Sequence, residues 1–175
     1  MTNEIDLRID SVRFREVLGH LPTGVTVVTA YHRDEPVGMS SNSVTSVSLE
    51  PPLILFCPAR TSKTWPKIRA AGSFCVNVFA AHHEEISRQF SRLGVDRFAG
   101  VGWHRRPSGP AIDDAVAWIE CTLDAEHPGG DHVIVVGAVH HLEVREGEVE
   151  PLVFFRGQYG SFSGNERGAS DGGES

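Results

Sequence analysis

AVAWIECTLDAEHPGGDHVIVVGAVHHLEVR, residues 115–145, predicts two long strands joined by a tight turn. The strands run from Ala115 to His127 and from His132 to Arg145, where β-branched and other apolar residues are frequent. Between them, Pro128-Gly129-Gly130-Asp131 has the composition of a hairpin turn. A hairpin of this length indicates a protein built mainly from antiparallel β-structure.

The rest of the chain predicts shorter strands separated by turns, together with a few helices. The strands cover residues 25–30, 37–40, 53–57, 74–79 and 152–155, and the helices cover 11–20, 82–92 and a segment from Thr61 or Ser62 to Ala71. Residues 96–114 show no sustained periodicity and predict a long loop, and a stretch rich in Ser, Thr and Asn lies between the strand over 37–40 and Pro51-Pro52. Because hairpin signals join most strands, the pattern favours an antiparallel barrel or sandwich.

A dinucleotide-binding α/β fold is disfavoured, since Gly100-Val101-Gly102 lacks the third glycine of the fingerprint and follows no apolar strand. The chain has 175 residues, a length typical of one domain. Residues 1–10 predict an N-terminal extension, residues 11–162 the folded domain, and residues 163–175, rich in Gly, Ser and Glu, a disordered tail.

Charge and apolar patterning exclude several classes of partner. The net charge is −7 and the basic residues are scattered, which argues against binding to nucleic acid. No apolar run approaches the ~20 residues of a membrane-spanning helix, so we expect no membrane partner and a cytoplasmic protein. The cysteines Cys57, Cys75 and Cys121 are odd in number and lie in apolar runs, which favours buried free thiols.

Three segments carry residues suited to ligand chemistry. The first, Gly38 to Leu53, places short hydroxyl and amide side chains directly after a strand. Backbone N–H groups and short donors at close approach suit a flat heterocycle rich in acceptors. Composition alone leaves the alternative open, because most loops rich in Ser, Thr and Asn bind nothing.

The second segment, Cys57 to Trp65, is a strand end followed by a helix start with hydroxyls and two cations. Free N–H groups at a helix start attract phosphate, which Lys63 or Arg60 would neutralise. An ordinary capped helix with solvated cations is the competing interpretation.

The third segment is Gly129-Gly130-Asp131-His132, at the mouth of the long hairpin. The imidazole of His132 can face a ligand there, and Asp131 can orient the ring. A metal site is disfavoured despite nine histidines, since adjacent histidines point apart and no carboxylate or Cys completes a ligand set.

Five motifs occur together along the chain: Pro22 to Thr29, Gly38 to Pro52, Phe74 to Val78, Asp96 to Gly100, and Gly130-Asp131-His132 with Phe155 to Tyr159. In this order they resemble the flavin reductase family. The resemblance extends from about Phe14 to Phe162 and is specific to the small reductase components of two-component flavin-dependent monooxygenases.

The resemblance implies a mainly β fold, an antiparallel split β-barrel of the Greek-key, FMN-binding type with a few peripheral helices. It also implies a homodimer that binds FAD or FMN at its interface, reduces it with NADH or NADPH, and releases the reduced flavin to a separate monooxygenase. An acidic chain without a clear Arg cluster for the extra phosphate of NADPH favours NADH. The alternative function is a non-catalytic flavin-binding protein for electron transfer or storage.

The resemblance also assigns site residues. It places the flavin against Val37, Gly38, Met39, Ser40, Asn42 and Ser43 and against Cys57, Pro58 and Ala59, with the phosphate near Lys63 and Thr64. The nicotinamide stacks beside His132, the residue given a catalytic role, and Phe155, Arg156 and Tyr159 close the pocket. No metal ligands are assigned.

Overall fold

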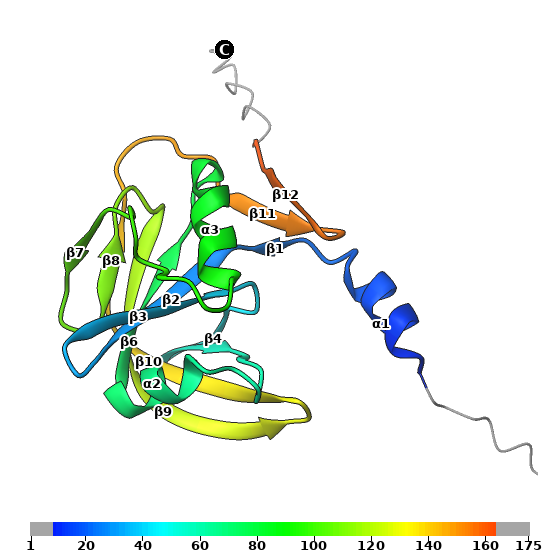
Figure 1. Ribbon diagram of the computed structural model, residues 1–175, viewed down its shortest axis with the longest axis horizontal. Helices are drawn as coiled ribbons and strands as arrows, with labels where there is room; N and C mark the ends of the chain where they lie inside the picture. The colour runs from blue at the N-terminus through cyan, green and yellow to red at the C-terminus, as the bar shows by residue number, and fades with distance from the viewer. Residues whose placement is uncertain (1–8, 164–175) are drawn as a thin grey trace, which may run out of the picture.

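Antiparallel β-sheet forms most of the regular structure in the computed structural model, which describes residues 9–163 (Figure 1). The largest sheet has seven strands, in the order β3 (Glu35–Ser41), β2 (Thr26–His32), β6 (Ser73–Val78), β9 (Ala117–Gly129), β10 (His132–Val144), β5 (Pro52–Phe56) and β4 (Thr45–Leu49). The mainly β, antiparallel prediction is confirmed. The long hairpin formed by β9 and β10 is also confirmed, with His132 paired to Gly129 at its tip.

The two edges of this sheet are neighbours in the sequence. β3 and β4 stand at opposite ends of the strand order, yet only residues 42–44 separate them. The four Cα–Cα steps from Ser41 to Thr45 span roughly 14 Å at most, so the sheet curls until its edges approach each other at this connection. Two register shifts in the pairing of β9 with β10, one that leaves out Asp124 of β9 and one that leaves out His140 of β10, help the long hairpin to bend.

Smaller elements cover the sheet and its ends. A three-stranded sheet contains β1 (Thr23–Gly24), β11 (Leu152–Phe155) and β12 (Gln158–Ser161), and a two-stranded sheet contains β7 (Trp103–Arg105) and β8 (Pro110–Ile112). The helices are α1 (Ser11–Leu18), α2 (Trp65–Ala71) and α3 (Glu84–Ser91), which follows the short 3-10 helix η1 (Ala81–His83).

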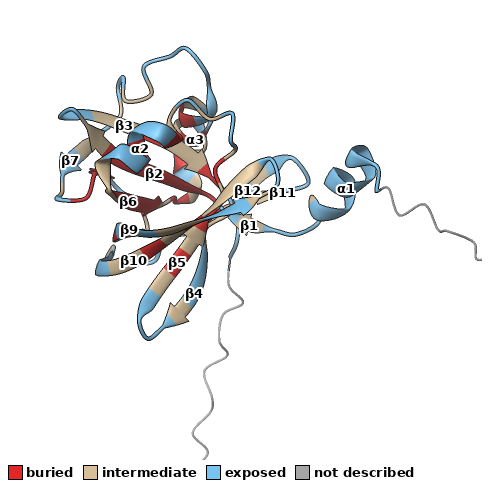
Figure 2. Cartoon of the chain, turned by 90° about the horizontal axis from the view of Figure 1, so that it is seen from below, coloured by how far each residue is buried: buried red, intermediate tan, exposed pale blue. Residues whose placement is uncertain are grey.

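The core lies on both sides of β2 and β6. One cluster packs the rings of Phe56, Phe74 and Trp65, with the centroid of Phe56 5.3 Å from that of Phe74 and 5.6 Å from that of Trp65. A second cluster, under α3, includes Phe79 and Phe90. Figure 2 shows buried residues concentrated in β2 and β6, whereas α1 is exposed along its length.

A polar network joins β2, β6 and β8 inside this core. The side chain of Asn77 donates from Nδ2 to the Val27 carbonyl and to Thr29 Oγ1 (both 3.1 Å), and Oδ1 accepts from the backbone N–H of Ile112 (2.7 Å). Thr29 Oγ1 in turn donates to the Pro110 carbonyl at 2.6 Å. Asn77 and Thr29 are fully buried, so these bonds form without competing water.

The helix α1 projects from the sheets (Figure 1). Asp10 caps its start by accepting from the backbone N–H of Val12 at 3.2 Å. None of its residues is buried, and its apolar side chains Phe14, Val17 and Leu18 stay exposed. The apolar face of α1 therefore has no apolar surface to pack against within residues 9–163.

Several predicted boundaries are wrong. The predicted loop over residues 96–114 contains β7 and β8, the stretch rich in Ser, Thr and Asn contains β4, and β12 had no predicted counterpart. The second helix begins at Trp65 instead of Thr61 or Ser62, although the Ser62 hydroxyl accepts from the N–H groups of Thr64 and Trp65. Its predicted end at Ala71 is confirmed, and Gly72 follows as the C-cap with φ 72°.

The cysteine prediction is confirmed for two of three thiols. Cys75 and Cys121 are buried, Cys57 is half-buried, and all three are free. Burial raises the pKa of both Cys75 and Cys121 to about 12, so neither thiol ionises near neutral pH. The extension over residues 1–10 and the tail over residues 163–175 fall mostly outside the described residues and stay predictions.

Replacing Asn77 by Ala should lower the free energy of unfolding by about 2–4 kcal/mol, because it leaves the buried Ile112 N–H and Val27 carbonyl without this partner. Urea unfolding monitored by circular dichroism measures the change. Asn42→Ala, at an exposed position, is the matched control and should stay within about 0.5 kcal/mol of the parent. Equal effects at the two positions would contradict the role of the buried amide.

Candidate functional site

The strand β3 carries the largest group of predicted site residues, and its two faces meet different surroundings. Gly38 and Ser40 face α3: a Cβ on Gly38 would lie 2.6 Å from Phe90 Cε1, and Ser40 Oγ lies 3.1 Å from Ser87 Oγ. Val37 and Met39 pack against the cluster around Phe56. Two cavities open along β3, one near its start and one at its end.

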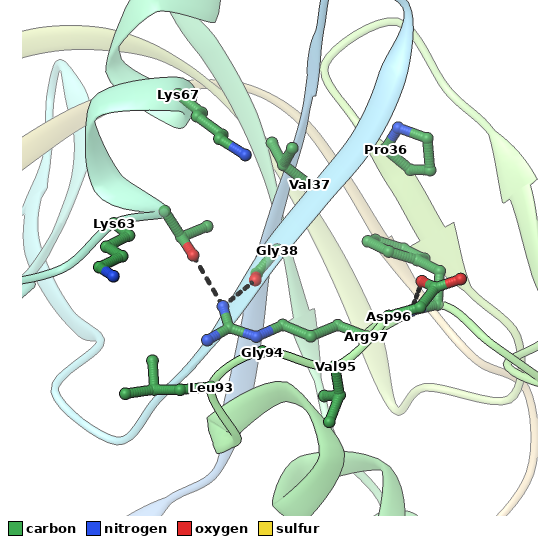
Figure 3. Close-up of a pocket in the computed structure, with 12 residues that line it drawn as sticks. Pro36, Val37, Gly38, Lys63, Lys67, Leu93, Gly94, Val95, Asp96 and Arg97 are labelled. Atoms are coloured by element: carbon green, nitrogen blue, oxygen red, sulfur yellow. Dashed lines mark hydrogen bonds between the residues drawn. The ribbon is translucent and has the colours of Figure 1, made fainter.

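The first cavity, here called the lysine pocket, has a volume of about 380 Å³ (Figure 3). Its walls are Pro36 to Gly38 of β3, the side chains of Lys63, Thr64 and Lys67, and residues 93–98 after α3. The structure thus brings together four predicted cofactor-binding residues, Val37, Gly38, Lys63 and Thr64. The association of the β3 segment with the α2 start is the one that the resemblance implied.

The side chain of Arg97 joins two walls of the lysine pocket by hydrogen bonds. No role was predicted for this residue. Its Nη1 donates to the Gly38 carbonyl (2.7 Å) and to Thr64 Oγ1 (2.8 Å), and its Nε and Nη2 donate to the Arg92 carbonyl (3.1 and 3.0 Å; Figure 3 draws the first two). Burial lowers the pKa of the Arg97 guanidinium. The available sequence signal was the motif Asp96-Arg97-Phe98, which follows a helix.

The second cavity, here called the serine pocket, measures about 210 Å³ and includes Ser40, Asn42 and Tyr159 in its lining. All three were predicted to bind cofactor. Ser87 of α3 links two of them, because its hydroxyl lies 3.1 Å from Ser40 Oγ and 3.0 Å from the Tyr159 hydroxyl. Ser87 is fully buried and was missed by the sequence reasoning.

Ser43 and Cys57 meet at the ends of neighbouring strands. Ser43 Oγ accepts from the backbone N–H of Cys57 at 2.8 Å, which fixes the β3–β4 connection against the end of β5. Burial raises the pKa of the Cys57 thiol, which makes the thiol harder to ionise.

The hairpin tip of β9 and β10 lies against the chain after β5. Ala59 forms a β-bridge with His132, Val133 donates to the Pro58 carbonyl at 3.0 Å, and Arg60 donates to the Asp131 carbonyl at 2.9 Å. The predicted residues Pro58, Ala59 and His132 are therefore neighbours.

The His132 ring contacts the carboxylate of Asp131, with Nδ1 2.7 Å from Oδ1. This hydrogen bond is the main reason that the pKa of Asp131 lies below its ordinary value. With Nδ1 engaged by Asp131, the half-exposed ring retains Nε2 for another partner.

Two of the three residues predicted to close the pocket share a cavity, and the third lines a different one. Phe155 and Tyr159 both line a cavity of about 540 Å³ on the β11–β12 hairpin, and Tyr159 also lines the serine pocket. Arg156 lies at the end of α1, where its N–H donates to the Gly19 carbonyl at 2.8 Å. Among residues 9–163, no hydrogen bond or ring contact joins His132 to Phe155 or Tyr159. One chain by itself thus gathers only part of the predicted site.

The residues present fit a phosphorylated, acceptor-rich ligand. The lysine pocket offers cations and a hydroxyl, and the serine pocket offers short hydroxyl and amide side chains. Across residues 9–163, no three His, Cys, Asp or Glu side chains come together to hold a metal ion. None of the described helices is long and apolar enough to span a membrane.

Comparisons with known proteins agree with this chemistry. Residues 18–163 match the family model "Flavin reductase like domain". The chain is 46% identical over 156 residues to the reductase subunit HsaB of a flavin-dependent monooxygenase from Mycobacterium tuberculosis, covering 87% of this chain and 82% of the relative. It is 41% identical over 155 residues to the FMN reductase (NADH) SmoA from Agrobacterium fabrum, covering 88% and 87%.

A solved structure shows the same fold. The NADH:FAD oxidoreductase SgcE6 from Streptomyces globisporus C-1027, in complex with NAD and FAD fragments, superposes with a TM-score of 0.84 at 38% identity, covering 90% of this chain and 95% of that one. Since the family model covers most of the chain and the match to these relatives covers more than four fifths of their length, the chain belongs to the flavin reductase family.

Proposed function

We propose that the protein binds FAD or FMN along β3, reduces it with NADH or NADPH, and passes the reduced flavin to a partner monooxygenase. The observation that carries the proposal is the pair of pockets on β3, which brings cations and short hydroxyl side chains to one strand of a flavin reductase domain. The chain is accordingly an NAD(P)H-dependent flavin reductase. Relatives named as reductase subunits of monooxygenases support the transfer to an oxygenase.

In this proposal the flavin lies across the connection between β3 and β4. Ser40 and Asn42 line the serine pocket, and Ser43 holds the Cys57 N–H beside it. Met39 supports this part of β3 from its other face, and Pro58 and Ala59 supply backbone surface beside the hairpin tip. Lys63 and Thr64 take the phosphate, because a cation and a hydroxyl bind phosphate oxygens with charge-assisted hydrogen bonds.

The nicotinamide lies beside His132 at the hairpin tip. Asp131 holds the imidazole through Nδ1, and the ring then offers Nε2 to a ligand carboxamide. When both substrates are bound they supply the chemistry, a hydride transfer from nicotinamide to flavin, and the chain orients the two rings and excludes water. No side chain needs to move a proton for this role.

The proposal includes the finer fold and assembly. The curled sheet whose edges meet at residues 42–44 supports a split barrel of the FMN-binding, Greek-key type. The exposed apolar face of α1 supports a homodimer in which a second copy completes the site. A cytoplasmic location is supported by the free thiols of Cys57, Cys75 and Cys121.

Oxidation of NADH by the purified protein should depend on added FAD or FMN. The loss of absorbance at 340 nm (roughly the reduced nicotinamide band) follows turnover, with NADH and NADPH compared at saturating flavin. No turnover with either flavin would reject the reductase function. Flavin retained through gel filtration together with slow NADH oxidation would instead favour a flavin-storage protein.

Replacing His132 by Ala should lower kcat/KM for NADH by a few-fold to about tenfold while flavin affinity changes little. The lost hydrogen bond is worth about 0.5–1.5 kcal/mol, and each ~1.4 kcal/mol is tenfold. His127→Ala, an exposed histidine on the same hairpin, is the control. Unchanged NADH kinetics with a lowered Tm would mean that His132 only stabilises the turn.

Light scattering should return about twice the 19.1 kDa chain mass. Val17→Glu places a charge in the exposed apolar face of α1 and should shift the protein toward the monomer, whereas Glu16→Ala on the polar face should not. A parent protein that is monomeric and still reduces flavin would remove the second copy from the site.

A further inference from the structure

A chain of side-chain hydroxyls connects the two cavities that Tyr159 lines. Ser87 Oγ lies 3.1 Å from Ser40 Oγ and 3.0 Å from the Tyr159 hydroxyl. Ser40 lines the serine pocket, whereas Tyr159 lines both this pocket and the cavity of about 540 Å³ on the β11–β12 hairpin. Ser87 is fully buried in α3 and belongs to the lining of neither cavity. One buried residue thus joins hydroxyls that serve two different spaces.

The heavy atoms of this chain are held in place by their surroundings. The guanidinium carbon of Arg88 lies 4.7 Å from the centroid of the Tyr159 ring, and the Phe154 ring meets the same ring edge to face with centroids 5.2 Å apart. On α3, Ser91 Oγ donates to the Ser87 carbonyl at 3.0 Å. The freedom that remains in the chain is therefore the rotation of its hydroxyl hydrogens.

The number of hydrogens limits how the chain can be arranged. Within residues 9–163, the hydroxyls of Ser40 and Tyr159 have no hydrogen-bond partner except Ser87. A buried hydroxyl hydrogen without a partner is unfavourable, so Ser87 donates to one neighbour and accepts from the other. When Ser87 donates to Ser40, Tyr159 donates to Ser87 and the Ser40 hydrogen is free for a ligand. When Ser87 donates to Tyr159, the free hydrogen is that of Tyr159.

We propose that Ser87 is a positioning residue that makes ligand binding at Ser40 and at Tyr159 cooperative through the direction of this hydroxyl chain. A ligand acceptor at Ser40 selects the direction in which Tyr159 donates to Ser87. The Tyr159 oxygen then accepts from a second ligand. The hydroxyls only rotate, so every proton stays on its own oxygen.

The chemistry of the two substrates matches one direction of the chain. The inference rests on the proposed function, which assigns Ser40 to the flavin, and the family resemblance assigns Tyr159 to the pocket of the nicotinamide. An oxidised flavin ring is rich in acceptors, and the nicotinamide carboxamide carries N–H donors. With the free hydrogen on Ser40 and an accepting oxygen on Tyr159, the chain serves both ligands at once.

Equilibrium binding to the full chain tests the proposal without turnover, because NAD⁺ leaves an oxidised flavin unreduced. FAD or FMN, whichever the parent reduces faster, is titrated by fluorescence with and without saturating NAD⁺. The flavin Kd without NAD⁺ divided by that with NAD⁺ is the cooperativity factor, which should exceed unity in the parent. Ser87→Ala should lower this factor by a few-fold to about tenfold, the scale of one hydrogen bond. A parent factor of unity, or an unchanged factor in Ser87→Ala, would overturn the proposal.

Two further variants separate positioning from packing. Ser108→Ala removes another buried serine hydroxyl, which lies 3.2 Å from His140 Nε2 and outside both cavities, and should leave the factor unchanged. Tyr159→Phe keeps the ring and should lower the factor as Ser87→Ala does, with no further decrease in the double variant. Additive decreases, or an equal decrease in Ser108→Ala, would contradict a role of Ser87 through Tyr159.

Failure of the inference is distinguishable from failure of the proposed function. A parent that reduces flavin with NADH but binds flavin and NAD⁺ independently keeps the reductase function and loses the inference. A parent that reduces neither FAD nor FMN rejects the proposed function, and the inference with it. Urea unfolding of Ser87→Ala and Ser108→Ala shows whether lower stability alone changes the factor, because both variants lose a buried hydroxyl.

Discussion

The buried side-chain amide of Asn77 is the interaction on which the arrangement of the site depends. It hydrogen-bonds the Val27 carbonyl, Thr29 and the Ile112 N–H. These bonds fix the positions of β2, β6 and β8 relative to one another. The close approach of Gly109 to β2, where a Cβ would lie 2.5 Å from the Thr29 carbonyl oxygen, follows from the same contact. Thr29 pairs with Gly38 across the β2–β3 ladder, and the Gly38 carbonyl accepts from Arg97. The position of the lysine pocket therefore depends on a hydrogen-bond network deep in the core.

Much of the fold was predictable because its strands follow simple patterns. The β9–β10 hairpin combines long β-branched runs with a Gly-Gly turn, and β5 is a continuous apolar run. The strand β4 was not predictable in this way, since Thr45, Ser46 and Val47 are all exposed and leave no alternating apolar signal. The strands β7 and β8 are only three residues each and lie among Gly and Pro, so pairing across the loop stabilises them and local propensity does not.

The site was predictable where neighbouring residues make it, and less so where distant contacts do. Val37, Gly38, Lys63 and Thr64 were expected together from the family resemblance, and the fold places them in one pocket. Arg97 was missed because its partners are two main-chain carbonyls and a hydroxyl, groups that a sequence pattern does not reveal. Ser87 was missed for a similar reason: its role comes from the packing of α3 over β3 and β12.

The tip of the β11–β12 hairpin is fastened to the end of α1. The Arg156 N–H donates to the Gly19 carbonyl, and the rings of His20 and Phe155 meet edge to face with centroids 6.2 Å apart. The same hairpin carries Tyr159, which hydrogen-bonds Ser87 at the serine pocket. If α1 docks on a second copy, any shift of the helix displaces the hairpin and with it one wall of the pocket. Subunit association and ligand affinity then share a coupling free energy, so flavin binding tightens as the protein concentration rises.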